Sequence, residues 1–100
     1  MPKRFTRFAD FYPVYLAMHD NPTNRRLHLL GNLFALVVLA AAVSRSWWLL
    51  LAVPVVGNVP PWIGHYRFQQ NRPGVFTYPV CGFIGSWAMT RDVLLGRIRF

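Results

Sequence analysis

Residues 27–43 read LHLLGNLFALVVLAAAV, and residues 47–63 read WWLLLAVPVVGNVPPWI. Only the polar turn at residues 44–46 separates these two apolar stretches. Each has about 17 residues, which is near the lower limit for a helix that crosses the hydrocarbon core of a bilayer. We therefore expect an all-α membrane protein built around a transmembrane helical hairpin, with a single membrane domain over residues 1–100.

The composition supports a membrane protein over a soluble one. Hydrophobic residues make up 54% of the chain and charged residues only 14%, compared with about 25% charged residues in soluble domains. The net charge of +8 suggests an anionic partner. The basic residues lie at the ends of the apolar stretches, so this partner is expected to be membrane lipid and not nucleic acid. The single cysteine, Cys81, excludes an intramolecular disulfide.

The basic residues also predict the topology of the hairpin. Five precede the first apolar stretch, one lies in the turn, and five follow the second: Lys3, Arg4, Arg7, Arg25 and Arg26; Arg45; Arg67, Arg72, Arg91, Arg97 and Arg99. Since cytoplasmic loops carry more Lys and Arg, both termini are expected in the cytoplasm and the turn outside. We expect an integral protein of the inner or plasma membrane of a bacterium.

The segments beside the hairpin are less regular. Residues 5–19 carry aromatic side chains at helical spacing, and Pro13 predicts a helix that begins or kinks there. This helix would lie in the interface or pack on the hairpin. Asn21 and Pro22 predict a capped helix start. Residues 74–89 fit a re-entrant segment, an interfacial helix or a third span, of which a full span is the least expected.

The three histidines are expected to meet at one end of the hairpin. His19 lies before the first stretch, His28 lies at its start, and His65 follows the second stretch. The turn brings these ends together, on the cytoplasmic side. Three neutral imidazoles can bind a first-row transition metal, and Asp20 offers an alternative set of two histidines and one carboxylate. The competing interpretation is that each histidine only forms hydrogen bonds near the interface.

Helical spacing places further polar residues near the histidines. His28, Asn32 and two small residues share one face of the first stretch, and Asn58 and His65 share a face of the second. Pro54, Gly57, Asn58, Pro60 and Pro61 predict that the second helix is kinked or partly unwound. Either asparagine could orient groups that bind the metal.

Other catalytic arrangements are missing from the sequence. It has no glutamate, no Gly-rich phosphate loop and no Cys-x-x-Cys pair, and Ser86 lies outside a nucleophile motif. Arg25, Arg26 and Arg72 lie near the histidines in the sequence. They could bind the carboxylate of a lipid substrate, or they could only supply the cytoplasmic positive charge.

Two motifs resemble a known family. Residues 19–28 read HDNPTNRRLH and residues 64–73 read GHYRFQQNRP. Together with Gly31, Tyr78-Pro79 and Met89, they are similar to the 2-hydroxy fatty acid dioxygenase family. These small membrane proteins act in the pathway that converts phytosphingosine to odd-chain fatty acids. The resemblance covers about residues 11–97. This chain differs in having Gln69-Gln70 where the family usually has Glu-Lys, and Ser86 where the family often has an acid.

The resemblance implies iron(II)-dependent alpha-oxidation, in which a 2-hydroxy fatty acid and dioxygen give a fatty acid that is one carbon shorter. His19, His28 and His65 would be the iron ligands, and Gln69 would replace a ligand or a residue that supports one. The alternative is a non-catalytic membrane hairpin that organises lipid or a partner protein. A weaker alternative is a metal or lipid carrier. A homo-oligomer is compatible with all three.

Overall fold

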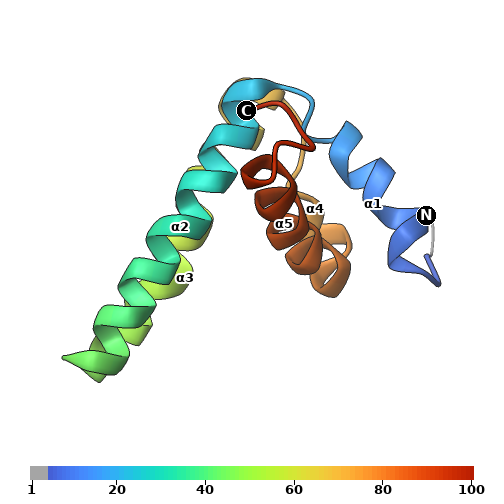
Figure 1. Cartoon of the computed structure of the whole chain (residues 1–100). Coiled ribbons are helices and arrows are strands. Elements are labelled where there is room, and N and C mark those ends of the chain that lie inside the picture. Colours follow the sequence, from blue (N-terminus) through green and yellow to red (C-terminus); the bar gives the residue numbers. More distant parts are fainter. Residues whose placement is uncertain (1–4) are drawn as a thin grey trace.

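The computed structural model describes residues 5–100, and over this range the chain forms α-helices and no β-strand. Two long antiparallel segments make a hairpin, and three shorter helices lie beside one half of it (Figure 1). The prediction of an all-α fold around a helical hairpin is confirmed. The shorter helices are α1 (Phe8–Ala17), α4 (Gly74–Thr77) and α5 (Pro79–Leu94).

The first arm of the hairpin is α2 (Pro22–Ser44), which begins and ends as the sequence predicts. The Asn21 side-chain oxygen accepts hydrogen bonds from the backbone N–H groups of Thr23 at 2.9 Å and Asn24 at 3.4 Å. Pro22 occupies the first helical position, where its missing N–H costs nothing. The helix stops at the polar turn, where Arg45 leaves the helical conformation.

The second arm changes its winding twice. It starts as a 3₁₀ helix, η1 (Trp47–Leu51), continues as α3 (Ala52–Ile63) and ends as a π-helix, η2 (Gly64–Gln69). Pro60 and Pro61 lie inside α3 and supply no backbone N–H group. The expectation of an irregular second helix is met by these changes of winding. Gln70, with a positive φ of 58°, terminates η2.

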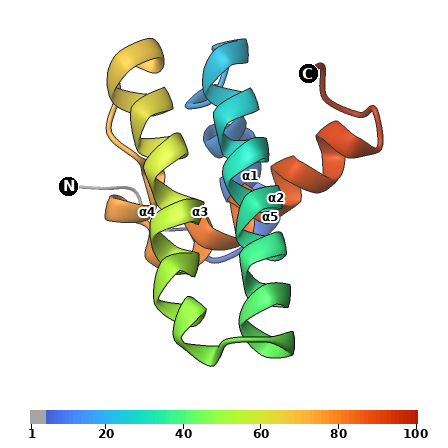
Figure 2. The same ribbon diagram turned by 90° about the vertical axis from the view of Figure 1, so that its left-hand side faces the viewer.

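The two arms run side by side (Figure 2). Small residues between them allow close packing. A Cβ atom on Gly31 would lie 3.0 Å from the Gly57 carbonyl oxygen and 3.0 Å from Cδ of Pro61. On the other arm, a Cβ atom on Gly57 would meet Cβ of Ala35 at 3.4 Å. The face of α2 that carries His28 is therefore the face that contacts α3, as its small residues indicated.

Both arms are long and apolar enough to cross a membrane: Pro22–Ser44 has a mean hydropathy of 2.1 and Trp47–Gln69 one of 1.3. Within the most apolar 18-residue stretch of each arm, only 33% of the first and 11% of the second is buried inside the protein. A core helix of a soluble protein would be mostly buried, so the exposed apolar side chains of the hairpin favour contact with lipid.

The shorter helices are held together by an aromatic core. Phe11 and Tyr15 of α1 are buried with Met89 of α5. A Cβ atom on Gly85 would come within 3.0 Å of the Tyr15 ring, so a glycine is needed for this contact. Pro13 lies inside α1, which begins five residues earlier, at Phe8. Of the two alternatives, a helix that starts at Pro13 is wrong, and a kink at Pro13 stays a prediction.

The segment after the hairpin contains α4 and α5, and α5 crosses behind the two arms at an angle (Figure 2). With 16 residues, α5 is shorter than a typical membrane span. Tyr12 of α1 donates a hydrogen bond to the Asp92 carboxylate at 2.7 Å and ties α1 to the end of α5. The end of the hairpin that carries the turn projects beyond these helices (Figure 1).

Candidate metal centre

The three histidines meet in the interior at the end of the hairpin opposite the turn. His19 lies in the loop after α1, His28 in α2 and His65 in η2, and all three are buried. Their ring centroids lie 4.4, 4.5 and 4.9 Å apart, and one ring nitrogen of each lies within 4.8 Å of the other two. The predicted convergence of the histidines is confirmed.

Each histidine uses its Nδ1 atom to bond a fixed oxygen. The Nδ1 of His19 lies 2.7 Å from the Tyr15 carbonyl oxygen, and the Nδ1 of His28 lies 3.0 Å from that of Asn24. The Nδ1 of His65 lies 2.5 Å from the side-chain oxygen of Asn71. Carbonyl oxygens can only accept hydrogen bonds, so each Nδ1 carries the proton. Each Nε2 is therefore left with a lone pair.

Three lone pairs directed at one small volume make a site for a cation. Nε2 of His19 and Nε2 of His28 are 3.2 Å apart, and neither has a proton to donate to the other. Burial, followed by the neighbouring His28, lowers the pKa of His19 to about 2, so this imidazole is neutral at physiological pH. Neutral imidazoles whose other ring nitrogen is hydrogen-bonded are the usual ligands of first-row transition metals. The donor set fits a metal ion.

Asn71 has a supporting role that the sequence did not reveal. Its Nδ2 donates to the Met18 carbonyl oxygen at 2.9 Å, which orients the amide so that the oxygen faces His65. Its backbone N–H donates to the carbonyl of His65 at 3.1 Å. Asn71 therefore connects the loop that carries His19 to the helix that carries His65.

Asp20 and Gln69 lie outside the cluster. Asp20 is exposed and accepts a hydrogen bond from the Gln69 side chain. The alternative in which Asp20 completes a set of two histidines and one carboxylate is therefore contradicted. The Gln69 side-chain oxygen accepts from the Asn21 N–H at 2.8 Å and from Nδ2 of Asn24 at 3.3 Å. Gln69 therefore contacts Asn24, whose backbone carbonyl oxygen bonds His28, and it does not occupy a ligand position.

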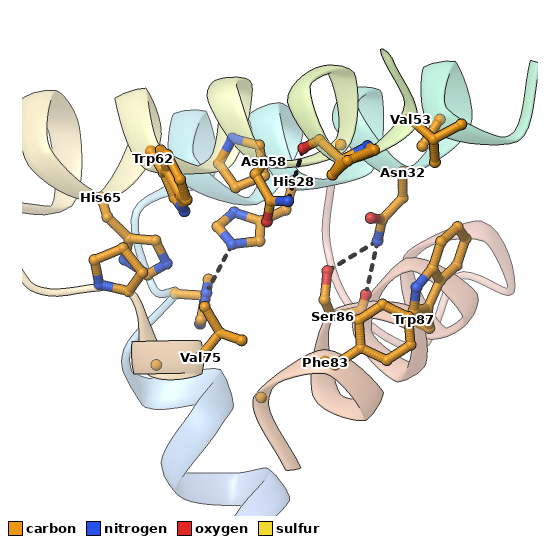
Figure 3. A pocket seen from close by; sticks show the side chains of 18 of the residues that line it. His28, Asn32, Val53, Asn58, Trp62, His65, Val75, Phe83, Ser86 and Trp87 are labelled. Atoms are coloured by element: carbon orange, nitrogen blue, oxygen red, sulfur yellow. Dashed lines mark hydrogen bonds between the residues drawn. The ribbon is translucent and has the colours of Figure 1, made fainter. Parts of the chain in front are cut away.

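A cavity of about 360 Å³ extends from the histidines along the hairpin. Beyond His28 and His65 its walls are mostly apolar, with Leu39 and Val53 from the two arms and Trp87 from α5. Figure 3 shows this arrangement, with the two arms on one side and α5 on the other. A cavity that is polar at one end and apolar along the rest suits a ligand with a polar head and a hydrocarbon chain.

Two asparagines line the cavity, as helical spacing suggested. The Asn32 amide nitrogen donates to Oγ of Ser86 at 2.9 Å and to Oγ1 of Thr90 at 2.8 Å. Nδ2 of Asn58 donates to the Pro54 carbonyl within its own helix at 2.7 Å. Neither asparagine bonds a histidine among the residues described. Ser86, which replaces a frequent family acid, therefore contacts Asn32 and not the histidines.

The three candidate arginines do not line this cavity. Arg25 donates from one terminal nitrogen to the carbonyl oxygens of His19 and Asp20, both at 2.9 Å. Arg26 lies over the Phe100 ring and Arg72 over the Phe76 ring. Arg25 therefore fixes the backbone of the loop that bears His19. Binding of a substrate carboxylate by the three arginines stays a prediction.

Comparison with known proteins places the chain in one family. The model of a family described as Mpo1-like, 2-hydroxy-palmitic acid dioxygenase Mpo1-like, matches residues 5–98. No curated protein matches the chain, and no solved structure does. The match covers the segments that carry the three histidines and the helices that line the cavity.

Proposed function

Because the chain belongs to the Mpo1-like family of 2-hydroxy-palmitic acid dioxygenases, we propose that it is an iron(II)-dependent dioxygenase of 2-hydroxy fatty acids. The observation that carries the proposal is the convergence of three buried, neutral imidazoles at the polar end of an apolar cavity. His19, His28 and His65 would hold the iron. A bound iron(II) would supply open coordination positions for dioxygen and for the oxygens of the substrate.

The reaction balances without a further reductant. A 2-hydroxy fatty acid and dioxygen give the fatty acid one carbon shorter, carbon dioxide and water. The bond between the carboxyl carbon and C2 breaks, C2 is oxidised to the new carboxyl group, and dioxygen takes up the four electrons. The site therefore has to bind the substrate head group, exclude bulk water and keep three imidazoles neutral.

The shape of the cavity supports a fatty acid as the substrate. The head group would lie against His28 and His65, and the acyl chain would extend past Leu36 towards Leu39 and Val53. These side chains belong to the part of the hairpin that is apolar enough to cross a membrane. A substrate dissolved in the bilayer could therefore enter the cavity without passing through water.

The arginines would act before the substrate reaches the histidines. Arg25, Arg26 and Arg72 lie around the end of the hairpin that carries the histidines but outside the cavity. We propose that they attract the fatty acid carboxylate, and anionic lipid head groups, at the membrane surface. The excess of basic residues on this side favours an integral protein of an inner or plasma membrane with both termini in the cytoplasm.

The segment from α4 to α5 would dip into the same side of the membrane. No charged residue lies between Arg72 and Arg91. Phe76, Val80 and Phe83 of this segment are exposed. An uncharged segment with exposed apolar side chains and an arginine at each end fits a shallow re-entrant position next to the hairpin.

Product analysis tests the proposed function. The purified protein would be loaded anaerobically with iron(II) in detergent and given 2-hydroxypalmitic acid and dioxygen. We expect pentadecanoic acid and carbon dioxide in equal amounts, and loss of both products in His28→Ala. Val37→Ala, an exposed position on the same helix, is the matched control and should keep its activity. Absence of product from the iron-loaded wild-type protein would contradict the proposal and favour a non-catalytic hairpin.

A further inference from the structure

Asn32 is a buried polar residue whose role the histidine site does not explain. It lies on α2 one helical turn after His28, it is only 6% exposed, and it lines the cavity. Side chains four residues apart on a helix are neighbours, with Cβ atoms about 5–6 Å apart. Asn32 therefore faces the part of the cavity next to the histidines, where the first carbons of a bound fatty acid would lie.

Three oxygens of α5 fix the orientation of the Asn32 amide. Its nitrogen lies 2.8 Å from Oγ1 of Thr90 and 2.9 and 3.2 Å from the hydroxyl and carbonyl oxygens of Ser86. The Thr90 hydroxyl donates its own hydrogen to the Ser86 carbonyl, so it can only accept from Asn32. The nitrogen must therefore point to α5. The carbonyl oxygen then points the other way, into the cavity (Figure 3).

This oxygen has no hydrogen-bond donor among residues 5–100. It is not enclosed by protein atoms, because it is accessible from the cavity that Asn32 lines. Asn58 differs, because it is only partly buried and its amide nitrogen bonds its own helix. An oriented acceptor that is directed into the cavity can bind a ligand that supplies a donor.

We propose that the side-chain carbonyl of Asn32 accepts a hydrogen bond from the 2-hydroxyl group of the substrate. Asn32 would thereby select 2-hydroxy acids over unsubstituted fatty acids. A carbonyl oxygen attracts a hydroxyl hydrogen and repels a carboxylate, so it distinguishes the two oxygens of the head group. The inference rests on the proposed function, and it assigns the recognition of the hydroxyl group to one residue.

The test is the ratio of affinities for two acids that differ only in the hydroxyl group. Protein loaded with iron(II) in the absence of dioxygen would be titrated with 2-hydroxypalmitic acid and with palmitic acid. Tryptophan fluorescence reports binding, because Trp62 and Trp87 line the cavity. In Asn32→Leu the preference for the hydroxy acid should fall about five- to tenfold, which is the contribution of one hydrogen bond. Palmitic acid should bind as before.

Two further variants keep the test independent of folding defects. Thr90→Val leaves residue 32 unchanged but removes one of its anchors, and should lower the preference about two- to threefold. Asn58→Leu is the matched control on the facing helix and should keep the wild-type ratio.

Two results would overturn the inference while leaving the proposed function in place. One is a wild-type ratio in a folded Asn32→Leu that binds both acids. The other is a loss of the preference in Asn58→Leu but not in Asn32→Leu. If the wild-type protein binds neither acid, the proposed function itself fails, which is a separate outcome.

Discussion

At the histidine end of the hairpin the buried side chains are polar and hold one another in place, whereas at the turn end apolar side chains are exposed. His19, His28 and His65 are each fixed by an oxygen acceptor. Val43 and Leu51, near the turn, are 79% and 78% exposed. The same two arms form both ends. The histidine end therefore needs particular residues at particular positions, whereas the turn end needs only apolar residues.

Two glycines of the second arm should show the largest difference. A Cβ atom on Gly64 would collide with the Asn24 side chain, beside His28, whereas one on Gly57 would make an almost ordinary contact with Ala35. We expect Gly64→Ala to lower the free energy of unfolding by about 2–3 kcal/mol. Gly57→Ala should change it by less than about 1 kcal/mol. Chemical unfolding in detergent, followed by circular dichroism, measures both.

Equal stability of the two variants would contradict this account of the histidine end. It would mean that Asn24 can move without cost, although its backbone carbonyl oxygen accepts the hydrogen bond from His28. The metal affinity of Gly64→Ala gives a second measurement, because a displaced Asn24 should also weaken metal binding.

Asn71 should affect metal binding chiefly through its hydrogen bond to His65. Asn71→Leu removes the acceptor of the His65 Nδ1 proton and the donor to Met18, and should weaken metal binding about 10- to 100-fold. Asn71→Asp keeps an acceptor for the same proton and should recover most of the affinity. Equilibrium dialysis against cobalt(II) measures the affinities. A similar loss in both variants would show that packing, and not the hydrogen bond to His65, is responsible.

The pH dependence of stability should also differ between the two ends. Burial lowers the pKa of His19 to about 2, compared with about 6.5 in an unfolded chain. As the pH falls below 6.5, only the unfolded chain takes up this proton. The metal-free protein should therefore lose up to about 1.4 kcal/mol of stability per pH unit through His19. Unfolding of the wild type and of His19→Gln between pH 7 and 5 measures this slope.

A stability that does not change between pH 7 and 5 would mean that His19 is accessible to protons in the folded protein. In His19→Gln the slope should be smaller by the contribution of one proton. A matched substitution at the turn end, Val43→Ala, should leave the slope unchanged, because it removes no titratable group.

The smallest effect is expected at Gln69, where this chain departs from its family. In Gln69→Glu a carboxylate would face the Asp20 carboxylate, and we expect a loss of about 0.5–1 kcal/mol of stability. The double variant with Asp20→Asn restores a donor opposite this carboxylate and should recover most of the loss. Metal affinity should stay unchanged in both, because residue 69 is not a ligand. A gain in metal affinity would reopen that question.

Much of the fold could be predicted from the sequence, because its strongest signals are local. The apolar stretches, the cap at Asn21 and the turn at residues 44–46 lie where the sequence places them. The convergence of the histidines followed from the turn alone. The start of α1 was missed because its packing against α5 outweighs the cost of Pro13 inside the helix.

The residues that support the site could not be predicted in the same way. Asn71 contacts Met18, 53 positions earlier, and Asn32 contacts Ser86 and Thr90 at similar separations. Their roles depend on how α5 and the loop after η2 pack, which no local pattern encodes. Asp20 was considered as a ligand because it is next to His19, but its side chain points away to Gln69.

The most direct test of the account is the number of metal ions that each chain binds. Purified protein would be dialysed anaerobically against iron(II), in parallel with His65→Ala and with Val55→Ala, an exposed position on the same arm. The account predicts one tightly bound ion per chain in the wild type and in Val55→Ala, and none in His65→Ala. A wild-type protein that binds no metal, or a His65→Ala variant that binds one ion as tightly, would contradict the claim that the three histidines form a metal centre.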